Sequence, residues 1–417
     1  MDAFRIVGGG TLKGTVRMSG AKNAALPIIV ATLLAPGKSI LRNVPDLRDV
    51  ATISKLLRLL GAKVTFDENV LTVDTTGVNT WEAPYELVKT MRASVYVLGP
   101  LLARFGRARV SLPGGCAWGP RPVDLHIKGM QELGAEITVE HGYIVAQAER
   151  LTGARIHFDV SSVGATGNVM MAAVLARGIT LIENAAREPE IAALADFLKK
   201  MGAHIEGEGT DTIKIEGVDG LSPHEEGIIP DRIEAGTFMA AAAITEGDVT
   251  IEACVPEHVR AFTAKLVEAG VQIDEGEDHV YVDASKGLKP VDVTTAPYPG
   301  FPTDLQAQMM AVLSIARGTS VITETIFPDR FNHAPELRRL GADIRVDENV
   351  AIITGVKGLS GAQVMATDLR ASAALVLAGL VAEGETRISR VYHIDRGYER
   401  IEEKLSGLGA RIERIDE

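Results

Sequence analysis

Arg58-Leu59-Leu60-Gly61-Ala62-Lys63-Val64 is the stretch that decides the fold, because versions of it occur six times along the 417 residues. Each copy keeps an apolar residue, a glycine, a small or branched apolar residue, and then a polar and an apolar residue. This pattern is typical of a helix end, a glycine in the left-handed conformation and a following strand. The repeated glycines are Gly61, Gly134, Gly202, Gly270, Gly341 and Gly409. A repeat of about 70 residues predicts six copies of one α/β unit.

A second repeated pattern, a glycine followed by a β-branched strand, accompanies the first. Its glycines are Gly37, Gly106, Gly178, Gly247, Gly318 and Gly384. An apolar helix is expected before each of them, with starts near residues 21–23, 91–93, 163–165, 231–233, 303–305 and 369–371.

Length and repeat number together predict two domains of about 200 residues, with three units in each. Residues 221–231 contain two prolines and a polar stretch that interrupts the repeat, so they are expected to link the domains. The first domain would be residues 22–229, and residues 1–21 with 230–417 would form the second. The strand-like segments 4–7 and 15–18 stand outside the six units and are expected to pair with the last unit.

Composition excludes several functional classes. Forty-three Lys and Arg residues against 55 Asp and Glu residues give a net charge of 43 − 55 = −12, which disfavours nucleic acid or an anionic membrane as the main partner. The sequence has no apolar run of about 20 residues and no recognisable signal peptide. It has two cysteines and no motif for a metal, flavin or nicotinamide, so we expect a cytoplasmic protein without a cofactor.

Four of the six helix starts carry a cation: Lys22, Arg92, Arg232 and Arg370. A cation opposes the positive end of the helix dipole, so these residues suggest an anion bound among them, although side chains exposed to solvent are the alternative. Asp304 occupies the matching position of the fifth helix. It is either a proton acceptor in that anion pocket or only a helix cap.

Cys116 lies in a segment, about residues 112–122, that is rich in glycine and proline and is expected to form a mobile loop. Arg121 would lower the pKa of its thiol, so the sequence allows either a reactive cysteine or an inert one. Cys254 follows an apolar strand and is expected in the core. His126 follows the loop closely enough to line a pocket.

The chain resembles the UDP-N-acetylglucosamine enolpyruvyl transferases over essentially its whole length. The shared motifs are Ser19-Gly20-Ala21-Lys22-Asn23-Ala24, Met91-Arg92-Ala93-Ser94, Pro113-Gly114-Gly115-Cys116, residues 119–126, residues 162–166, residues 183–190, Gly300-Phe301-Pro302-Thr303-Asp304, Arg330-Phe331, Asp368-Leu369-Arg370-Ala371 and Asp395-Arg396-Gly397-Tyr398. The resemblance implies two similar domains, each of three βαβαββ-type units with the helices inside, and an active site in the cleft between them.

The implied reaction transfers enolpyruvate from phosphoenolpyruvate to the 3′-hydroxyl of UDP-N-acetylglucosamine, the first committed step of peptidoglycan synthesis. By resemblance, Cys116 is the general acid, can form a covalent adduct with phosphoenolpyruvate and is the target of fosfomycin, while Asp304 is the base. The phosphate of phosphoenolpyruvate would contact Lys22, Arg121 and Arg396, and its carboxylate Arg330 and Arg370. The UDP-sugar site would be lined by Asn23, Arg92, Arg121, Pro122, Val123, Asp124, Leu125, Ser161, Ser162, Val163, Gly164, Asp304 and Ile326.

One position departs from the family pattern. Members often carry a lysine just before the Ser-Val-Gly motif, whereas this chain has Val160 followed by Ser161. A contact to the diphosphate would then be lost or taken over by hydroxyl groups.

Two other functions compete with this interpretation. Enolpyruvylshikimate-phosphate synthase would have the same fold and the same donor, but by resemblance it lacks the Cys116 loop. A sensor that binds nucleotide sugars without turnover would need neither Cys116 nor Asp304.

Overall fold

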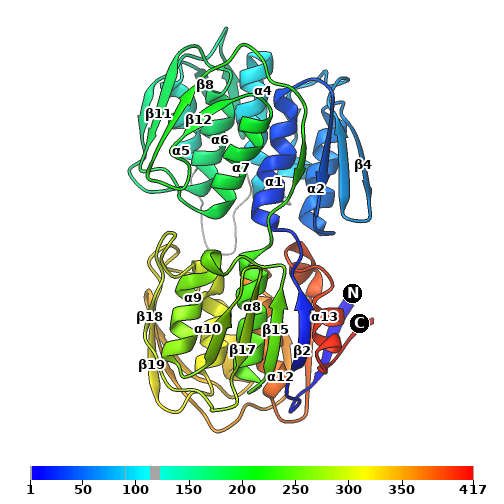
Figure 1. Cartoon of the computed structure of the whole chain (residues 1–417), viewed down its shortest axis with the longest axis vertical. Helices are drawn as coiled ribbons and strands as arrows, with labels where there is room; N and C mark the ends of the chain where they lie inside the picture. Colours follow the sequence, from blue (N-terminus) through cyan, green and yellow to red (C-terminus); the bar gives the residue numbers. More distant parts are fainter. Residues whose placement is uncertain (1, 90, 113–122, 417) are drawn as a thin grey trace. The chain divides into compact units, whose positions relative to one another are not determined.

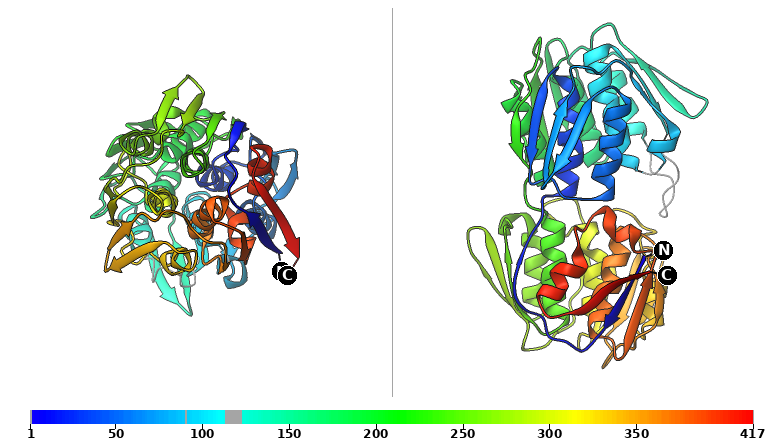
Figure 2. Two further views of the ribbon diagram at one scale, coloured as in Figure 1. Left: turned by 90° about the horizontal axis from the view of Figure 1, so that it is seen from below. Right: turned by 90° about the vertical axis from the view of Figure 1, so that its right-hand side faces the viewer.

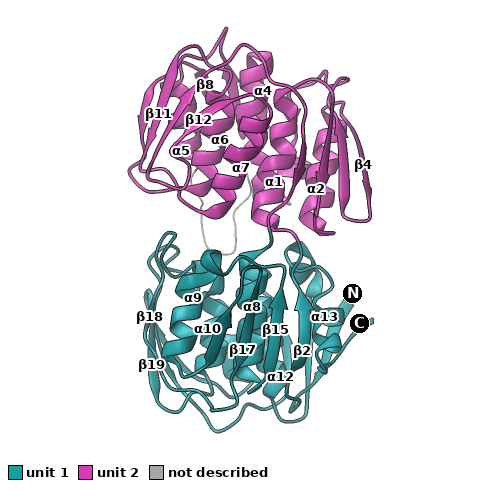
Figure 3. Ribbon diagram, in the orientation of Figure 1, with its two compact units in different colours: residues 1–19, 117–119, 230–417 teal, residues 20–116, 120–229 magenta. Residues whose placement is uncertain are grey.

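The structure, a computed structural model, describes residues 2–89, 91–112 and 123–416, and only the backbone of Arg92. It consists of two compact units (Figure 3). Unit 1 contains the described residues up to 19 and from 230 onward, and unit 2 contains those between 20 and 229. Gly20 and Ala21 were expected in the other unit. They belong to unit 2 because the Ala21 amide donates to the carbonyl of Ile229.

Unit 2 is built from three four-stranded sheets, in the orders β14-β3-β5-β4, β6-β7-β9-β8 and β10-β11-β13-β12. In each sheet one short edge strand is parallel to its neighbour and the remaining pairs are antiparallel. The strands are β3 (Lys38–Arg42), β4 (Lys63–Asp67), β5 (Val70–Asp74), β6 (Glu82–Ala83), β7 (Arg107–Ser111), β8 (Glu136–Glu140), β9 (Tyr143–Gln147), β10 (Arg155–His157), β11 (Ile179–Glu183), β12 (His204–Glu206), β13 (Thr212–Glu216) and β14 (Glu225–Gly227).

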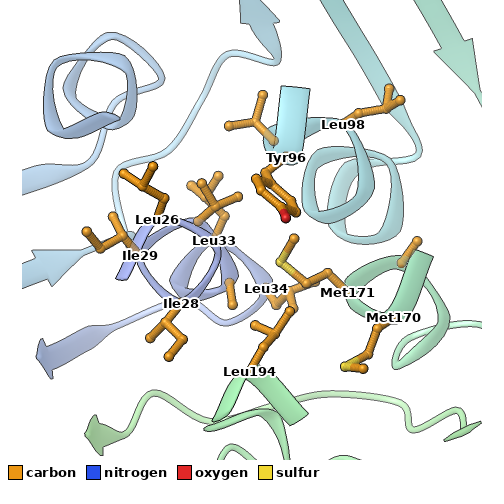
Figure 4. Packing of buried hydrophobic residues seen from close by; sticks show 14 of the residues in the cluster. Leu26, Ile28, Ile29, Leu33, Leu34, Tyr96, Leu98, Met170, Met171 and Leu194 are labelled. Carbon is orange, nitrogen blue, oxygen red and sulfur yellow. The ribbon is translucent and has the colours of Figure 1, made fainter. Parts of the chain in front are cut away.

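The helices of unit 2 form an inner and an outer set (Figures 1 and 2). Inner helices α1 and α6 are buried on nearly every side, and their apolar residues pack with η1, η2, α4 and α7 in one core (Figure 4). The amphipathic outer helix α2 buries only one face. The helical segments are α1 (Lys22–Ala31), η1 (Thr32–Leu34), α2 (Arg48–Leu59), α3 (Tyr85–Val88), η2 (Arg92–Val97), α4 (Leu98–Phe105), α5 (Asp124–Glu132), α6 (Val163–Ala173) and α7 (Pro189–Lys200).

Unit 1 repeats this plan with sheets in the orders β16-β17-β15-β2, β18-β19-β21-β20 and β22-β23-β1-β24. Its strands are β1 (Asp2–Val7), β2 (Lys13–Arg17), β15 (Asp248–Glu252), β16 (Gln272–Glu275), β17 (His279–Asp283), β18 (Val293–Thr294), β19 (Thr319–Thr323), β20 (Asp343–Asp347), β21 (Val350–Thr354), β22 (Gln363–Met365), β23 (Glu385–Ser389) and β24 (Arg411–Asp416). Its helical segments are α8 (Arg232–Ile244), α9 (Pro256–Glu268), η3 (Thr303–Leu305), α10 (Gln306–Leu313), α11 (Ala334–Arg339), α12 (Leu369–Val381), η4 (Val391–Arg396) and α13 (Ile401–Gly407).

Six sheets confirm the six units predicted from the sequence, and the α/β class with three βαβαββ units in each half is also confirmed. All six repeated glycines have positive φ values, between 90° and 112°. This is the conformation that the helix-to-strand pattern requires. The second and fifth inner helices begin with the 3₁₀ segments η2 and η3 rather than with an α-helical turn.

The two N-terminal strands complete different sheets of unit 1. β1 lies between β23 and β24, with Phe4 opposite Ile388 on one side and Arg414 on the other, so it pairs with the last unit as predicted. The prediction was wrong for β2, which pairs in parallel with β15 of the fourth unit, placing Thr15 opposite Thr250. β14, the strand that precedes α8 in the sequence, belongs to a sheet of unit 2. The N-terminal strand β2 therefore takes the edge position in the sheet of the fourth unit.

The expected linker, residues 221–231, also needs correction. Glu225–Gly227 form β14, which pairs in parallel with β3 and places Glu226 opposite Leu41. Backbone hydrogen bonds therefore fix residues 224–228 to the first sheet of unit 2. The change between units falls at residues 229 and 230.

Candidate active site residues

Among the predicted site residues of unit 1, Asp304 is the carboxylate that forms ion pairs with two arginines. It lies in η3, directly before α10, and its side chain keeps 27% of its exposure. Arg330 Nη1 lies 2.8 Å from Asp304 Oδ1, and Arg370 Nη2 lies 3.0 Å from Oδ2. Each carboxylate oxygen therefore has its own guanidinium partner, and both arginine side chains are at least 92% buried.

These contacts decide the protonation state of Asp304. Burial alone would raise the pKa of its carboxyl group, but the charges of Arg370 and Arg330 outweigh burial and hold the pKa well below its usual range. The alternative that Asp304 only caps a helix is wrong, since neither η3 nor α10 has a side-chain cap. Asp304 is thus an ionised carboxylate whose oxygens face cations.

Arg370 is fixed by its position in the first turn of α12. Asp368 caps this helix by accepting hydrogen bonds from the backbone amides of Arg370 and Ala371. Burial opposes the charged form of Arg370, but the carboxylate of Asp304 overcomes this and raises the pKa of the guanidinium. The cation predicted at this helix start is therefore paired with an acid of the same unit.

A buried polar cluster supports η3 from behind. The Tyr398 hydroxyl lies 2.9 Å from Thr237 Oγ1 and accepts a hydrogen bond from Gln308 Nε2 at 3.1 Å. The same Gln308 nitrogen lies 3.0 Å from the carbonyl oxygen of Asp304. The backbone that carries the Asp304 carboxylate is thus held by Gln308, which Thr237 and Tyr398 fix in place.

Ile326 and Arg396 occupy two other segments of unit 1. The Ile326 amide donates to Glu324 Oε1 at 2.8 Å, so a buried carboxylate that the sequence interpretation missed fixes this loop. Arg396 is the half-buried last residue of η4. Its neighbour Asp395 binds Arg414 through both carboxylate oxygens, at 2.7 and 3.2 Å, which ties η4 to β24.

Lys22 begins the first inner helix of unit 2, as predicted. Its Nζ lies 2.7 Å from Asp49 Oδ2, and the two side chains keep 11% and 4% of their exposure. Asp49 lies in the first turn of α2, where a carboxylate stabilises the helix dipole. The sequence interpretation missed Asp49, although an acid in the first turn of the next helix was visible. Asn23 follows Lys22 and is half-buried.

The segment 161–164 leads into α6, whose start has Gly164 where four of the other helix starts have a cation. Ser162 caps the helix, with its Oγ 3.3 Å from the Ala165 amide, and Ser161, Val163 and Gly164 are half-buried. A Cβ on Gly164 would lie 3.1 Å from His126 Nε2. His126 itself is 2% exposed, and its Nδ1 lies 3.0 Å from Asn168 Nδ2. It is therefore a buried residue in contact with the start of α6.

The remaining predicted residues lie on α5 or outside the described part of the chain. Val123 is the N-cap of α5 and is half-buried, as is Leu125, whereas Asp124 is exposed in the first turn. Cys116, Arg121 and Pro122 lie outside the described residues, as does the side chain of Arg92. Cys254 is 2% exposed, which confirms the core prediction, and burial raises the pKa of its thiol to about 11.

No group of three or more His, Cys, Asp or Glu side chains within 2–89, 91–112 and 123–416 is arranged to hold a metal ion. Among the helices of the described chain, none combines the length and the apolar character needed to cross a membrane.

The whole chain is similar to one family of enzymes. Residues 6–405 match the family described as EPSP synthase (3-phosphoshikimate 1-carboxyvinyltransferase). The crystal structure of the enolpyruvyl transferase NikO from Streptomyces tendae superposes with a TM-score of 0.89 and 29% identity, covering 99% of this chain and 98% of that one. EPSP synthase from Acinetobacter baumannii has a TM-score of 0.77 at 19% identity over both full chains, which shows the shared fold. Fold and family match together define the class, the enolpyruvyl transferases.

Relatives with higher sequence identity show which family of enolpyruvyl transferases the chain belongs to. The UDP-N-acetylglucosamine 1-carboxyvinyltransferase of Trichlorobacter lovleyi is 60% identical over 418 residues and covers all of both chains. The enzyme of the same name from Myxococcus xanthus is 60% identical over 99% of both chains, and that from Geobacter metallireducens is 58% identical over both full chains. The chain belongs to the UDP-N-acetylglucosamine 1-carboxyvinyltransferase family.

Proposed function

We propose that the protein transfers the enolpyruvyl group of phosphoenolpyruvate to the 3′-hydroxyl of UDP-N-acetylglucosamine and releases phosphate. This is the first committed step of peptidoglycan synthesis, and we place it in the cytoplasm. The observation that carries the proposal is the ionised carboxylate of Asp304, held by two buried arginines in a chain that keeps the full length of these relatives.

The reaction needs an acid, a base and cations. The sugar hydroxyl attacks C2 of phosphoenolpyruvate and loses its proton while C3 gains one, which gives a tetrahedral phospho-ketal. Loss of the C3 proton and of phosphate then restores the double bond. Charge accumulates on the phosphate and carboxylate groups, so positioned cations supply much of the rate enhancement. No metal or organic cofactor takes part in these steps.

Asp304 is the proposed base for the sugar hydroxyl. Its lowered pKa keeps it ionised at neutral pH but also makes it a weak proton acceptor while Arg330 and Arg370 remain paired with it. In the proposed mechanism the two arginines turn toward the carboxylate of phosphoenolpyruvate when that substrate binds. The pKa of Asp304 then rises, because part of the opposing positive charge is shared with the substrate. Binding of the donor thus activates the base.

The other roles fall to residues at the helix starts and in the cysteine loop. Lys22, Arg121 and Arg396 hold the transferred phosphate group, and Cys116 donates the proton to C3 and can form the covalent adduct. Asn23, Arg92, residues 121–125, residues 161–164 and Ile326 contact the UDP-sugar. Hydroxyl groups of Ser161 and Ser162 would take over the contact that a lysine at position 160 makes in other members.

Phosphate release tests the reaction directly. The protein is mixed with phosphoenolpyruvate, with or without UDP-N-acetylglucosamine, and shikimate 3-phosphate replaces the sugar in a parallel sample. We expect release only with the UDP-sugar. Release with shikimate 3-phosphate alone would assign the protein to the sister reaction. Binding of the UDP-sugar without any release would favour a sensor.

The two cysteines provide a test of the loop. Fosfomycin, an epoxide that resembles phosphoenolpyruvate, should label Cys116 and not Cys254, whose buried thiol stays protonated at neutral pH. Cys116→Ala should abolish turnover and keep UDP-sugar binding nearly intact. Peptide mass mapping locates the label, and its recovery on Cys254 would contradict the assigned reactivity.

A further inference from the structure

Glu324 stands out because it is fully buried, ionisable and absent from the roles assigned above. It follows β19 and has no exposed surface. Its side chain accepts four hydrogen bonds. Oε1 accepts from Thr295 Oγ1 at 2.8 Å and from the amides of Ile326 and Phe327 at 2.8 and 3.1 Å, and Oε2 accepts from Thr303 Oγ1 at 2.8 Å. Donors therefore hold both oxygens of a carboxyl group that has no contact with solvent.

The other units show what this repeat position normally does. Glu324 lies six residues after Gly318, a glycine of the second repeated pattern. At the same position, four other units have a residue with positive φ, namely Asn43, Asn184, Ala253 and Arg390. In two of them the asparagine donates one hydrogen bond to a backbone carbonyl that is distant in the sequence, from Asn43 to Ile228 and from Asn184 to Phe158. A neutral amide with one such hydrogen bond therefore serves this position in those two units, whereas the carboxyl group of Glu324 accepts four.

The two oxygens of Glu324 lead to two different parts of the candidate site. Oε1 fixes the backbone of the loop that carries Ile326. Oε2 accepts from Thr303, whose hydroxyl oxygen in turn accepts from Arg330 Nη1 at 3.0 Å. The same Arg330 nitrogen is the one that contacts Asp304 at 2.8 Å. Because the Thr303 hydroxyl donates its proton to Glu324 Oε2, its oxygen is left to accept from Arg330.

We propose that Glu324 is a positioning residue for the transfer reaction, which acts through Thr303 on the Arg330–Asp304 pair and through the backbone on Ile326. This inference rests on the proposed function, in which Asp304 is the base and Ile326 contacts the UDP-sugar. Glu324 touches no reacting atom, and its role is to orient the base and one wall of the acceptor site.

Glu324→Gln separates the effect that passes through Thr303 from the effect on the Ile326 loop. The amide oxygen must take the Oε1 place, because three donors meet there, so the NH₂ group faces Thr303. The Thr303 hydroxyl then loses the acceptor of its proton and must turn toward another, so its contact with Arg330 weakens, while the Ile326 loop keeps its hydrogen bonds. We expect kcat to fall on the order of ten-fold, with KM for UDP-N-acetylglucosamine changed by less than about two-fold.

Thr303 variants show whether the effect passes through this hydroxyl. Thr303→Val should lower kcat by a similar factor, and Thr303→Ser, which keeps the hydroxyl, should restore it. Adding Glu324→Gln to Thr303→Val should lower kcat no further, because the link is already broken. Asp292→Asn is the matched control, because exposed Asp292 accepts from the Val321 amide of the same strand at 2.8 Å, and its kcat should equal that of the wild type.

Steady-state phosphate release, with thermal unfolding of every variant, decides between positioning and mere stability. A normal kcat for Glu324→Gln would overturn the inference, as would losses that multiply in the double variant or a Thr303→Ser that fails to recover. A kcat loss that matches the loss of folded protein would overturn it too. A wild-type protein that releases no phosphate would overturn the proposed function as well, whereas an active wild type with unchanged variants would overturn only the role of Glu324.

Discussion

The inner-helix starts of the two units carry related charges but balance them differently. In unit 1, the cation of one inner helix, Arg370, is paired with the anion of another, Asp304. In unit 2, Lys22 is paired with Asp49, which belongs to an outer helix. The third start of unit 2 has no side chain at Gly164, and the ring of His126 lies beside it.

This difference has a chemical consequence. In unit 1 the carboxylate is itself a group proposed to react, so its two arginines set its basicity as well as its position. In unit 2 the carboxylate is placed at a helix start where it stabilises both the helix and the lysine. The same repeat therefore yields a carboxylate paired with two arginines in one unit and an oriented cation in the other.

Removal of the carboxylate in unit 1 should have the largest effect. In Asp304→Asn, two buried guanidinium groups face a neutral amide, which should destabilise the native state by about 3 kcal/mol. Loss of the base should lower kcat by about 10³-fold. Urea unfolding and phosphate release measure the two effects. Asp343→Asn, an exposed change in the same unit, is the control, and a kcat within about three-fold of the wild type would rule out Asp304 as the base.

The pair in unit 2 should behave as one energetic unit. Asp49→Leu or Lys22→Met alone leaves a charge with 11% or less of its side chain exposed, and each should cost about 2 to 3 kcal/mol. Lys22→Met combined with Asp49→Leu should cost at least about 1 kcal/mol less than the sum of the two single losses, because no charge is left behind. Urea titrations of the four proteins measure this coupling. Additive losses would show that the ion pair does not couple the two helices.

Acid should destabilise unit 1 through His333. Burial, and then the charge of Arg330, lowers the pKa of this 1% exposed histidine to about 3. The unfolded chain binds a proton below about pH 6.5 and the folded chain does not, so stability falls as the pH drops toward 3. Between pH 7 and pH 5 the loss should be about 2 kcal/mol.

Urea unfolding at several pH values tests this slope. His333→Gln should be less stable at pH 7 but should lose less stability between pH 7 and pH 5 than the wild type. His157→Gln, which replaces a histidine whose side chain is 62% exposed, is the control and should keep the wild-type slope. An identical slope in His333→Gln would mean that His333 is not kept neutral by the fold.

The sequence predicted the repeat because its signals are local. A glycine that needs positive φ lies at every helix-to-strand junction, and neighbouring residues alone specify that conformation. The pairing of β2 with the fourth unit and of β14 with the first was not predictable from this pattern. Edge strands of three to five residues are chosen by distant partners, and their own sequences carry little information about which sheet they join.

The candidate site was predictable in part for the same reason. Lys22, Asp304 and Arg370 were found because they occupy matched repeat positions. Asp49 and Glu324 were missed because their roles depend on which side chains the folded chain brings near them. The repeat position of Glu324 gives one usable signal, since four of the five equivalent residues adopt positive φ and two of them are asparagines. Roles for Cys116 and Arg121 remain predictions.

The smallest expected effect concerns Gly164. Its φ is not in the left-handed region, so alanine is opposed only by His126, whose ring atoms would lie 3.1 and 3.2 Å from the new Cβ. Alanine near a helix start gains up to about 1 kcal/mol in helix propensity, and displacing the ring costs about as much. Gly164→Ala should therefore change stability by less than about 0.5 kcal/mol in the wild type. In a His126→Ala background the same change should stabilise the protein by about 0.5 to 1 kcal/mol, because the space is then free. Urea unfolding of the four proteins measures both values. Equal gains in the two backgrounds would mean that the ring yields without cost, and the start of α6 would then owe its geometry to Ser162 alone.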